Sequence, residues 1–563
     1  MTMPLDQLMD DEWQAQLKAD PFLATSLGER DFNHLLPEMS ESAFAERLTE
    51  LREFKARWQK IKADDLSEED RLNYDLFGIM LDNKIGEIEF HEYRMPIDKT
   101  NGFHAYAPYY FATQLPAKTV DDYENLIARL EALPQYVAGA IEVMRAGLDY
   151  GQIPSNVTQD GVVEQMQAQI LDDPAASLFF QPFTKIPKTI GEQDQSRLAK
   201  AGEAAVRQAV IPAYKALSAF YQQEYAPKVK SEIGAANLPD GLTYYQFCLK
   251  RETTLDLTAE EIHQIGLEEV ARIRAEMDEA IVVSGFDGGR QAFVEYLRSD
   301  PKFYPETAEQ FLREAAYIVK KMEGQLPALF KTLPRMTYGV VPMPEEVAPG
   351  NTTARYSPPS MDGTRAGEYW VNTYDLKSRP LYELEALSLH EAVPGHHLQI
   401  ALQFELGDLP NFRRYGFFNA YIEGWALYSE RLGLETGFYQ DPYSNFGRLS
   451  FEMWRACRLV VDPGMHALGW TRQQAIDFMA DNTALTMLNI QSEVDRYISW
   501  PGQAVSYKIG EIKIRELRAK AEQALGSQFD VREFHDRILL SGPIPLSVLE
   551  QRITDWIAEQ QRK

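Results

Sequence analysis

Apolar residues recur at three- and four-residue spacing along most of this 563-residue chain. The clearest stretch, residues 121–151 (DDYENLIARLEALPQYVAGAIEVMRAGLDYG), ends in a glycine, a common helix terminator. Residues 257–281, 304–326 and 469–485 have the same period, and each begins near a threonine followed three residues later by Glu or Gln, an arrangement that caps helix N-termini. The pattern therefore predicts a mainly α-helical protein whose helices pack their apolar faces into a core.

One region departs from this pattern. Residues 335–376 are rich in Pro, Gly and β-branched residues. Within them, 338–342 (YGVVP) and 367–374 (GEYWVNTY) are predicted as short strands joined by a turn around 361–368 (MDGTRAGE). Because the chain has no internal repeat, low-complexity tract or Pro/Gly/Ser linker, we expect one large unit over 1–563, although this length allows two lobes.

Composition excludes several classes of protein. The formal net charge of -27 argues against a nucleic-acid-binding protein, which needs a basic face for phosphates. Its two cysteines, Cys248 and Cys457, are far apart in the sequence; they imply no disulfide framework, and they exclude a cysteine-rich metal site. The N-terminus has neither the basic nor the apolar region of a secretory signal, and no apolar run could span a membrane. We expect a cytoplasmic protein, although a chain with its signal removed would look the same.

A cluster of histidines indicates a metal site. Residues 389–399 read LHEAVPGHHLQ and contain His390, His396 and His397. On a regular helix, two imidazoles at i and i+4 are about 6 Å apart along the axis and can share one zinc ion, whereas i+6 faces away and i+7 is roughly 10 Å distant. Pro394 removes a backbone donor and Gly395 permits unusual backbone angles, so we predict a break that brings His396 beside His390. His397 remains the alternative ligand.

Two glutamates occupy sequence positions from which they could complete such a metal site. Glu391 directly follows the first histidine, where it can act as a general base on water activated by zinc. Glu423 lies in an apolar helical segment, residues 419–435 (NAYIEGWALYSERLGLE), and is the candidate third ligand. Glu430, two turns further on, could support the site, but we expect it to lie on a solvated helix face.

Four ordered motifs resemble the signatures of the bacterial "domain of unknown function 885" family. They are HEAVPGHHLQ, YIEGWALYSERL, RLVVDPGMHALGWTRQQAI and PGQAVSYKIGEIKI, densest over residues 350–550 of a resemblance that covers most of the chain. The family pattern is His-Glu-x-x-Pro-Gly-His, and the family is grouped with glutamate-type zinc peptidases. The resemblance implies His390, His396 and Glu423 as zinc ligands and Glu391 as the base, with the catalytic part at about 335–550.

The wider peptidase group includes angiotensin-converting enzyme and the thimet-type oligopeptidases. It implies a large helical two-lobed fold with a central cleft, and an edge strand beside the zinc helix that pairs with the peptide backbone. Residues 366–374 match the position of that strand, and Asn372 within it is a candidate substrate contact.

Four further residues are candidates for the same site. Tyr507 occupies the chain position where relatives place a tyrosine that stabilises the negative charge formed during hydrolysis. His466 could do similar work, and Arg458 and Lys508 could bind the terminal carboxylate of a peptide. Alternatively, Tyr507 and His466 are hydrogen-bonded core residues, and Arg458 and Lys508 are charged residues on the surface.

We therefore expect a zinc-dependent hydrolase that cleaves short peptides and has no nucleic-acid partner. The alternatives are a zinc amidase acting on a non-peptide substrate and a binding protein that keeps the fold without catalysis.

Overall fold

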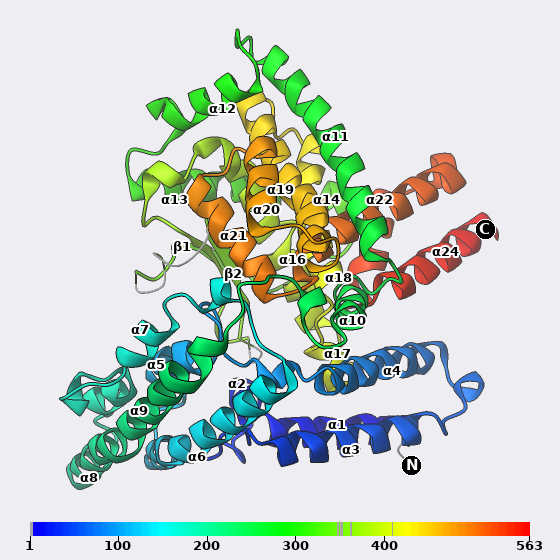
Figure 1. Cartoon of the computed structure of the whole chain (residues 1–563). Helices are drawn as coiled ribbons and strands as arrows, with labels where there is room; N and C mark the ends of the chain where they lie inside the picture. Colours follow the sequence, from blue (N-terminus) through cyan, green and yellow to red (C-terminus); the bar gives the residue numbers. More distant parts are fainter. Residues whose placement is uncertain (1–3, 346–347, 349–352, 361–362, 408, 563) are drawn as a thin grey trace. The chain divides into compact units, whose positions relative to one another are not determined.

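The computed structural model describes two compact units, Met1–Tyr244 and Tyr245–Lys563. The described residues are 4–345, 348, 353–360, 363–407 and 409–562. Helices form most of both units (Figure 1), so the prediction of a mainly α protein with a small sheet is confirmed. The sequence region with the metal-site motifs, about 335–550, belongs to the second unit. The expectations of one catalytic unit over 1–563 and of a central cleft stay predictions.

The first unit is built around the long helix α6. This helix runs from Val120 to Tyr150, with Thr119 and Asp122 forming a reciprocal cap at its start and Gly151 in a left-handed conformation at its end, as its sequence predicts. Its buried face packs against the helical segments that follow residue 178 in a continuous apolar core. The other α-helices of this unit are α1 (Pro4–Ala19), α2 (Pro21–Ser26), α3 (Glu41–Trp58), α4 (Glu68–Glu89), α5 (Phe103–Thr113), α7 (Val162–Gln167), α8 (Glu192–Ala205) and α9 (Ile211–Phe220).

The second unit is organised by two long helices that lie side by side, α11 (Ala259–Val283) and α19 (Pro442–His466) (Figure 1). Gly266 of α11 permits close packing, because a Cβ atom there would lie 2.7 Å from Leu459 Cβ of α19. The remaining α-helices are α10 (Gly241–Thr253, which begins in the first unit), α12 (Arg290–Ser299), α13 (Ala308–Glu323), α14 (Leu326–Leu329), α15 (Leu384–Glu391), α16 (His396–Glu405), α17 (Asn411–Arg414), α18 (Asn419–Leu432), α20 (Arg472–Asn482), α21 (Met487–Ser499), α22 (Ser506–Leu525), α23 (Val531–Leu539) and α24 (Leu546–Arg562).

The three threonine caps predicted in this unit are present. Thr258 and Thr471 form complete capping boxes with Glu261 and Gln474. The Thr307 hydroxyl accepts a hydrogen bond from the Gln310 N–H, and the Gln310 side chain bonds the neighbouring Glu306 N–H instead. Local spacing thus located these helix starts correctly.

A three-stranded sheet precedes α15, and its topology corrects two predictions. The strand order is β1 (Tyr338–Pro342), β3 (Gly367–Val371), β2 (Ala354–Ser357), with β1 parallel and β2 antiparallel to β3. The two predicted strands exist, but they are not joined by one turn, because β2 lies between them in the chain. The segment predicted as that turn, 361–368, lies between β2 and β3 and runs into β3; its residues 361 and 362 lie outside the described residues.

The strand expected at the sheet edge is central. Both sides of β3 are hydrogen-bonded, to β1 and to β2, so the strand within the predicted range 366–374 offers no free edge to a peptide, and the prediction of an edge strand is wrong. The edges of the described sheet are β1 and β2. Sequence pattern identifies a strand, but its neighbours are decided by contacts between distant segments.

No helix within the described residues is both long enough and apolar enough to cross a membrane.

Candidate metal centre

The helix carrying His390 breaks at the Pro-Gly pair. Helix α15 ends at Glu391 and α16 begins at His396, and the Val393–Pro394 peptide bond is cis. Gly395 lies so close to the end of α15 that a Cβ atom there would be 1.9 Å from the His390 carbonyl oxygen. The Trp425 Nε1–H of α18 donates a hydrogen bond to the Pro394 carbonyl at 2.9 Å. The predicted break is confirmed, and only glycine fits at position 395.

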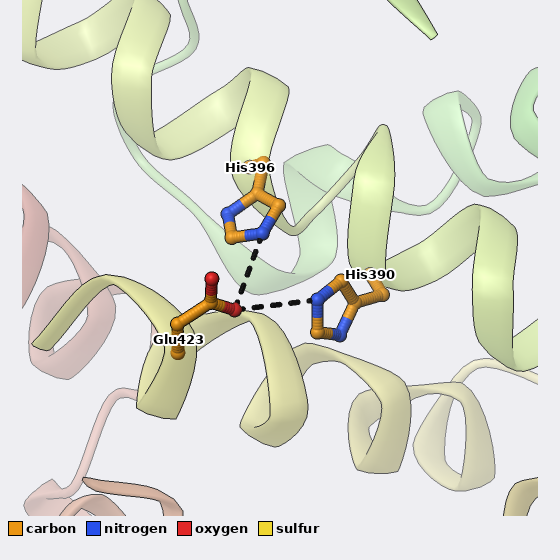
Figure 2. Close-up of side chains that lie close together, drawn as sticks. All are labelled: His390, His396 and Glu423. Carbon is orange, nitrogen blue, oxygen red and sulfur yellow. Dashed lines mark ion pairs between the residues drawn. The ribbon is translucent and has the colours of Figure 1, made fainter. Parts of the chain in front are cut away.

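The break brings together the three side chains predicted as ligands (Figure 2). The Nε2 atoms of His390 and His396 each lie 3.5 Å from Oε2 of Glu423, and the three candidate ligand atoms are all within 4.8 Å of one another. A tetrahedral zinc ion with bonds of about 2.0–2.1 Å separates its ligand atoms by about 3.4 Å. Glu423 Oε2 is buried and has no hydrogen bond within the described structure. These residues therefore fit a zinc ion.

Glu430 supports His390 from the opposite side of the imidazole ring. Its Oε1 lies 2.8 Å from His390 Nδ1, and the residue is 1% exposed. The expectation that Glu430 lies on a solvated helix face is wrong, because this face of α18 packs against α15. Burial lowers the pKa of His390, but the Glu423 and Glu430 carboxylates outweigh burial and raise the pKa to about 9. A carboxylate on Nδ1 orients the ring so that Nε2 is free to bind a metal.

The Glu423 carboxylate is held in its charged form. Burial raises its pKa, but the imidazoles of His396 and His390 outweigh burial and hold the pKa well below the usual range. The carboxylate is thus available as an anionic ligand.

His397 faces away from this group, towards the sheet. Its Nε2 lies 3.1 Å from the Met336 carbonyl, which can only accept, so Nε2 carries the proton and Nδ1 accepts from the Tyr356 hydroxyl at 2.9 Å. Burial lowers the pKa of His397 to about 4. With both nitrogen atoms engaged by protein groups, His397 is in no position to share a metal with His390.

Glu391 lies beside the candidate ligands and is held by the sheet. Its Oε2 accepts a hydrogen bond from the Tyr356 N–H of β2 at 2.8 Å, and the residue is half-buried. The carboxylate is therefore fixed next to His390 while part of the residue stays accessible. Nothing in the sequence around Tyr356 signalled this contact, because it joins segments 35 residues apart.

Tyr507 is brought towards Glu423 by a close helix crossing. Helices α18 and α22 meet at Gly424 and Gly510, where a Cβ atom on Gly424 would lie 2.5 Å from Gly510 Cα. Glu423 immediately precedes one glycine, and Tyr507 lies one turn before the other. Burial, and then the Glu423 carboxylate, raise the pKa of Tyr507. The crossing thus brings the phenol within electrostatic reach of the candidate metal ligand.

Comparison with known proteins agrees with the sequence motifs. The family described as "Bacterial protein of unknown function (DUF885)" matches residues 21–553. This chain belongs to the DUF885 family. The predicted family is confirmed, whereas the wider assignment to zinc peptidases stays a proposal.

Two solved structures are similar to this DUF885 chain over nearly its whole length. A candidate lipoprotein from Colwellia psychrerythraea is 32% identical, with a TM-score of 0.93 and 99% of each chain covered. A candidate lipoprotein of unknown function from Shewanella oneidensis is 19% identical, with a TM-score of 0.77 and coverage of 98% of this chain and 100% of that one. The second likeness shows the fold alone. No curated protein matches this chain.

Two residues expected to contact substrate in this DUF885 protein, Lys508 and Asn372, are engaged by other groups of the protein. Lys508 is fully buried, and its Nζ lies 2.8 Å from Glu452, 2.8 Å from Glu511 and 3.0 Å from Glu269. These three carboxylates converge as metal ligands would, but the Lys508 ammonium lies among them, and Arg272, Arg448 and Arg515 also pair with them. Asn372 is also fully buried, and its Nδ2 donates to the Ala348 carbonyl at 2.8 Å. These contacts favour structural roles and give no support to the predicted contacts with substrate.

His466 and Arg458 lie on α19. His466 is fully buried, with Nε2 at 3.0 Å from the Tyr497 carbonyl and its ring stacked on Tyr245. These contacts are typical of a core histidine and give no support to a catalytic role. Arg458 is 3% exposed, and its guanidinium lies 4.6 Å from the centroid of the Tyr507 ring. Arg458 is thus linked through Tyr507 to the metal-site candidates.

Proposed function

We propose that this DUF885 protein is a zinc-dependent hydrolase that cleaves peptide bonds in short peptides. The observation that carries the proposal is a buried, unbonded carboxylate oxygen of Glu423 at 3.5 Å from two imidazole Nε2 atoms, with the Glu391 carboxylate alongside. Two histidines and one glutamate leave one position of a tetrahedral zinc ion for water or substrate, which is the ligand set of hydrolytic rather than structural zinc sites.

When bound, zinc supplies a Lewis acid that acidifies water and polarises a carbonyl group. His390, His396 and Glu423 would hold it, and Glu430 keeps the His390 ring in the required orientation. Glu391 takes a proton from the attacking water and passes it to the leaving amine. The Tyr507 hydroxyl, which is protonated at neutral pH as tyrosines ordinarily are, donates a hydrogen bond to the oxygen that gains negative charge.

The zinc and the base are tested together by Glu391→Gln. The parent should contain about one zinc per chain and cleave members of a short-peptide library, detected by mass spectrometry. Glu391→Gln should keep its zinc and lose about 10²–10⁴-fold in cleavage rate. The control is Glu435→Gln, an exposed residue of the same unit, which should match the parent.

Three results would contradict parts of this proposal. A protein without stoichiometric zinc, or cleavage unaffected by a chelator, would rule out the metal mechanism. Undiminished cleavage by Glu391→Gln would remove Glu391 as the base. Zinc-dependent hydrolysis of non-peptide amides, with no peptide cleaved, would favour the amidase.

The relatives also bear on location. The 32% identical protein from Colwellia psychrerythraea is described as a candidate lipoprotein. On this basis we propose export rather than the cytoplasmic location expected from the sequence. Fractionation of the native host with an antibody to this chain tests it, and recovery in the cytoplasmic fraction would contradict it.

A further inference from the structure

Two buried arginines on one face of α19 retain hydrogen-bond donors without acceptors. Arg455 and Arg458 are three residues apart, 7% and 3% exposed. Within the described structure, Arg455 Nε and one terminal nitrogen of Arg458, Nη1, are buried and form no hydrogen bond. Burying such donors unpaired costs free energy, so an acceptor that binds beside them would be stabilised.

The charge around these arginines is also unbalanced. Arg458 forms an ion pair with Glu493 at 3.2 Å, but Arg496 shares the same carboxylate at 2.9 Å. Arg455 forms no ion pair among the described residues, and its guanidinium packs over the rings of Trp454 and Phe451 at 4.6 and 4.9 Å. The region therefore contains three guanidinium groups, those of Arg455, Arg458 and Arg496, and the ion pairs among the described residues here involve one carboxylate, that of Glu493.

Glu383 does not restore the balance. Its charge interacts with Arg379 and Arg455, but burial raises the pKa of Glu383 to about 7, so the carboxyl group is only partly ionised at neutral pH. The guanidinium groups of Arg455 and Arg458 therefore carry positive charge that a bound anion could compensate.

Tyr507 connects this positive region to the candidate metal centre. Its ring centroid is 4.6 Å from the Arg458 guanidinium and 6.0 Å from that of Arg455. The Gly424–Gly510 crossing brings the same tyrosine towards Glu423. An anion bound at Arg455 and Arg458 would thus be separated from the candidate metal centre by about one side chain, that of Tyr507.

We propose that Arg455 and Arg458 form a carboxylate-binding subsite that takes the free carboxyl terminus of the peptide substrate. Planar guanidinium groups bind carboxylates through paired, charge-assisted hydrogen bonds, and the two unbonded donors are available for this. Since an extended peptide advances about 3.3–3.6 Å per residue, the bond presented to the metal centre lies one or a few residues from the carboxyl end. The position of cleavage rests on the proposed hydrolase function, whereas carboxylate binding does not.

The first test measures binding without catalysis. Calorimetry with zinc-free protein compares one short peptide as the free acid, as the C-terminal amide, and as the C-terminal amide with an internal glutamate. The free acid should bind at least tenfold more tightly than either amide. Arg455→Gln and Arg458→Gln should each remove this preference, while Arg313→Gln, exposed on α13, should keep it.

The outcomes separate the subsite from the hydrolase. Equal binding of free acid and plain amide would overturn the subsite, and tight binding of the internal glutamate alone would replace the terminal carboxylate with an acidic side chain. Circular dichroism establishes that each variant is folded. If a glutamine variant does not fold, Arg455→Lys and Arg458→Lys keep the charge and should retain part of the preference; lysine variants equal to the parent would contradict recognition by the planar guanidinium group.

The second test uses zinc-loaded protein. Cleavage of the free acid should exceed that of the amide at least 100-fold in kcat/KM, with the cut near the carboxyl end. Cleavage without such a preference would overturn the subsite and leave the hydrolase intact. A free-acid preference in binding without any cleavage would support the subsite and contradict the hydrolase.

Discussion

The Nδ1 atom of His390 lies 2.8 Å from Oε1 of the buried Glu430, while Nε2 of the same ring faces Glu423. The imidazole is thus held between two carboxylates that lie two turns apart on α18, one placed to bind a metal and the other to orient the ring. This relationship accounts for the buried carboxylate of Glu430 in α18, a helix whose side chains are almost all buried.

Replacing Glu430 with Gln should weaken zinc binding by about 10–100-fold, because the ring loses its negative partner and part of its basicity. Competition with a chromophoric chelator measures the affinity. Glu435→Gln serves as the exposed control and should bind zinc like the parent. Unchanged affinity in Glu430→Gln would show that its hydrogen bond does not assist the metal.

His396→Ala and His397→Ala should differ in zinc content although the residues are adjacent. The first removes a candidate ligand and should abolish stoichiometric zinc. The second removes hydrogen bonds to Tyr356 and Met336, so it should lower stability while the folded protein keeps its zinc. Elemental analysis of the gel-filtered monodisperse protein gives the ranking, and the opposite ranking would exchange the roles of the two histidines.

Gly395→Ala should destabilise the metal centre by about 1–3 kcal/mol or more, because the new Cβ would overlap the His390 carbonyl. Urea unfolding and zinc titration together measure the effect. Gly407→Ala is the matched control, because a Cβ there meets nothing within 4 Å. Equal stability of the two variants would mean that the α15–α16 break relaxes easily.

Lys508→Met should lower the free energy of unfolding by about 3–5 kcal/mol, because it removes the buried ammonium that lies between three carboxylates. Lys520→Met, at an exposed position of the same helix, should have little effect. Chemical denaturation provides the comparison. A stable Lys508→Met protein that fails only in peptide binding would reinstate the substrate-anchoring role that burial argues against.

His535 should make the second unit sensitive to acid. Burial lowers its pKa in the folded protein to about 3, so below the unfolded value of about 6.5 the unfolded chain binds more protons and stability falls as the pH decreases. By pH 5 the loss from this residue should be about 2 kcal/mol.

His535→Gln removes this titration. In chelator-treated protein, the difference in unfolding free energy between pH 7 and pH 5 should therefore shrink by about 2 kcal/mol relative to the parent. His34→Gln, an exposed histidine, should follow the parent. An unchanged pH dependence in His535→Gln would contradict a buried neutral imidazole.

Sequence spacing alone located much of the molecule. The helix at 120–150, the threonine caps and the break at Pro394–Gly395 were all predicted, because each depends on interactions within a few residues. Spacing predicted that a break would bring a second imidazole beside His390, but it left His397 as an alternative to His396. The family pattern favoured His396, and the structure brings His396 and not His397 to His390 and Glu423.

Tertiary structure alone decided the rest. The order β1-β3-β2, the burial of Glu430 beside His390, and the capture of Lys508 by carboxylates up to 239 residues away depend on partners distant in the chain. Local pattern shows that a residue is charged or lies on a helix face. Whether that charge meets solvent, a counter-charge or a candidate ligand depends on which elements pack against it, because electrostatic and hydrogen-bond energies are set by the surrounding atoms rather than by sequence neighbours.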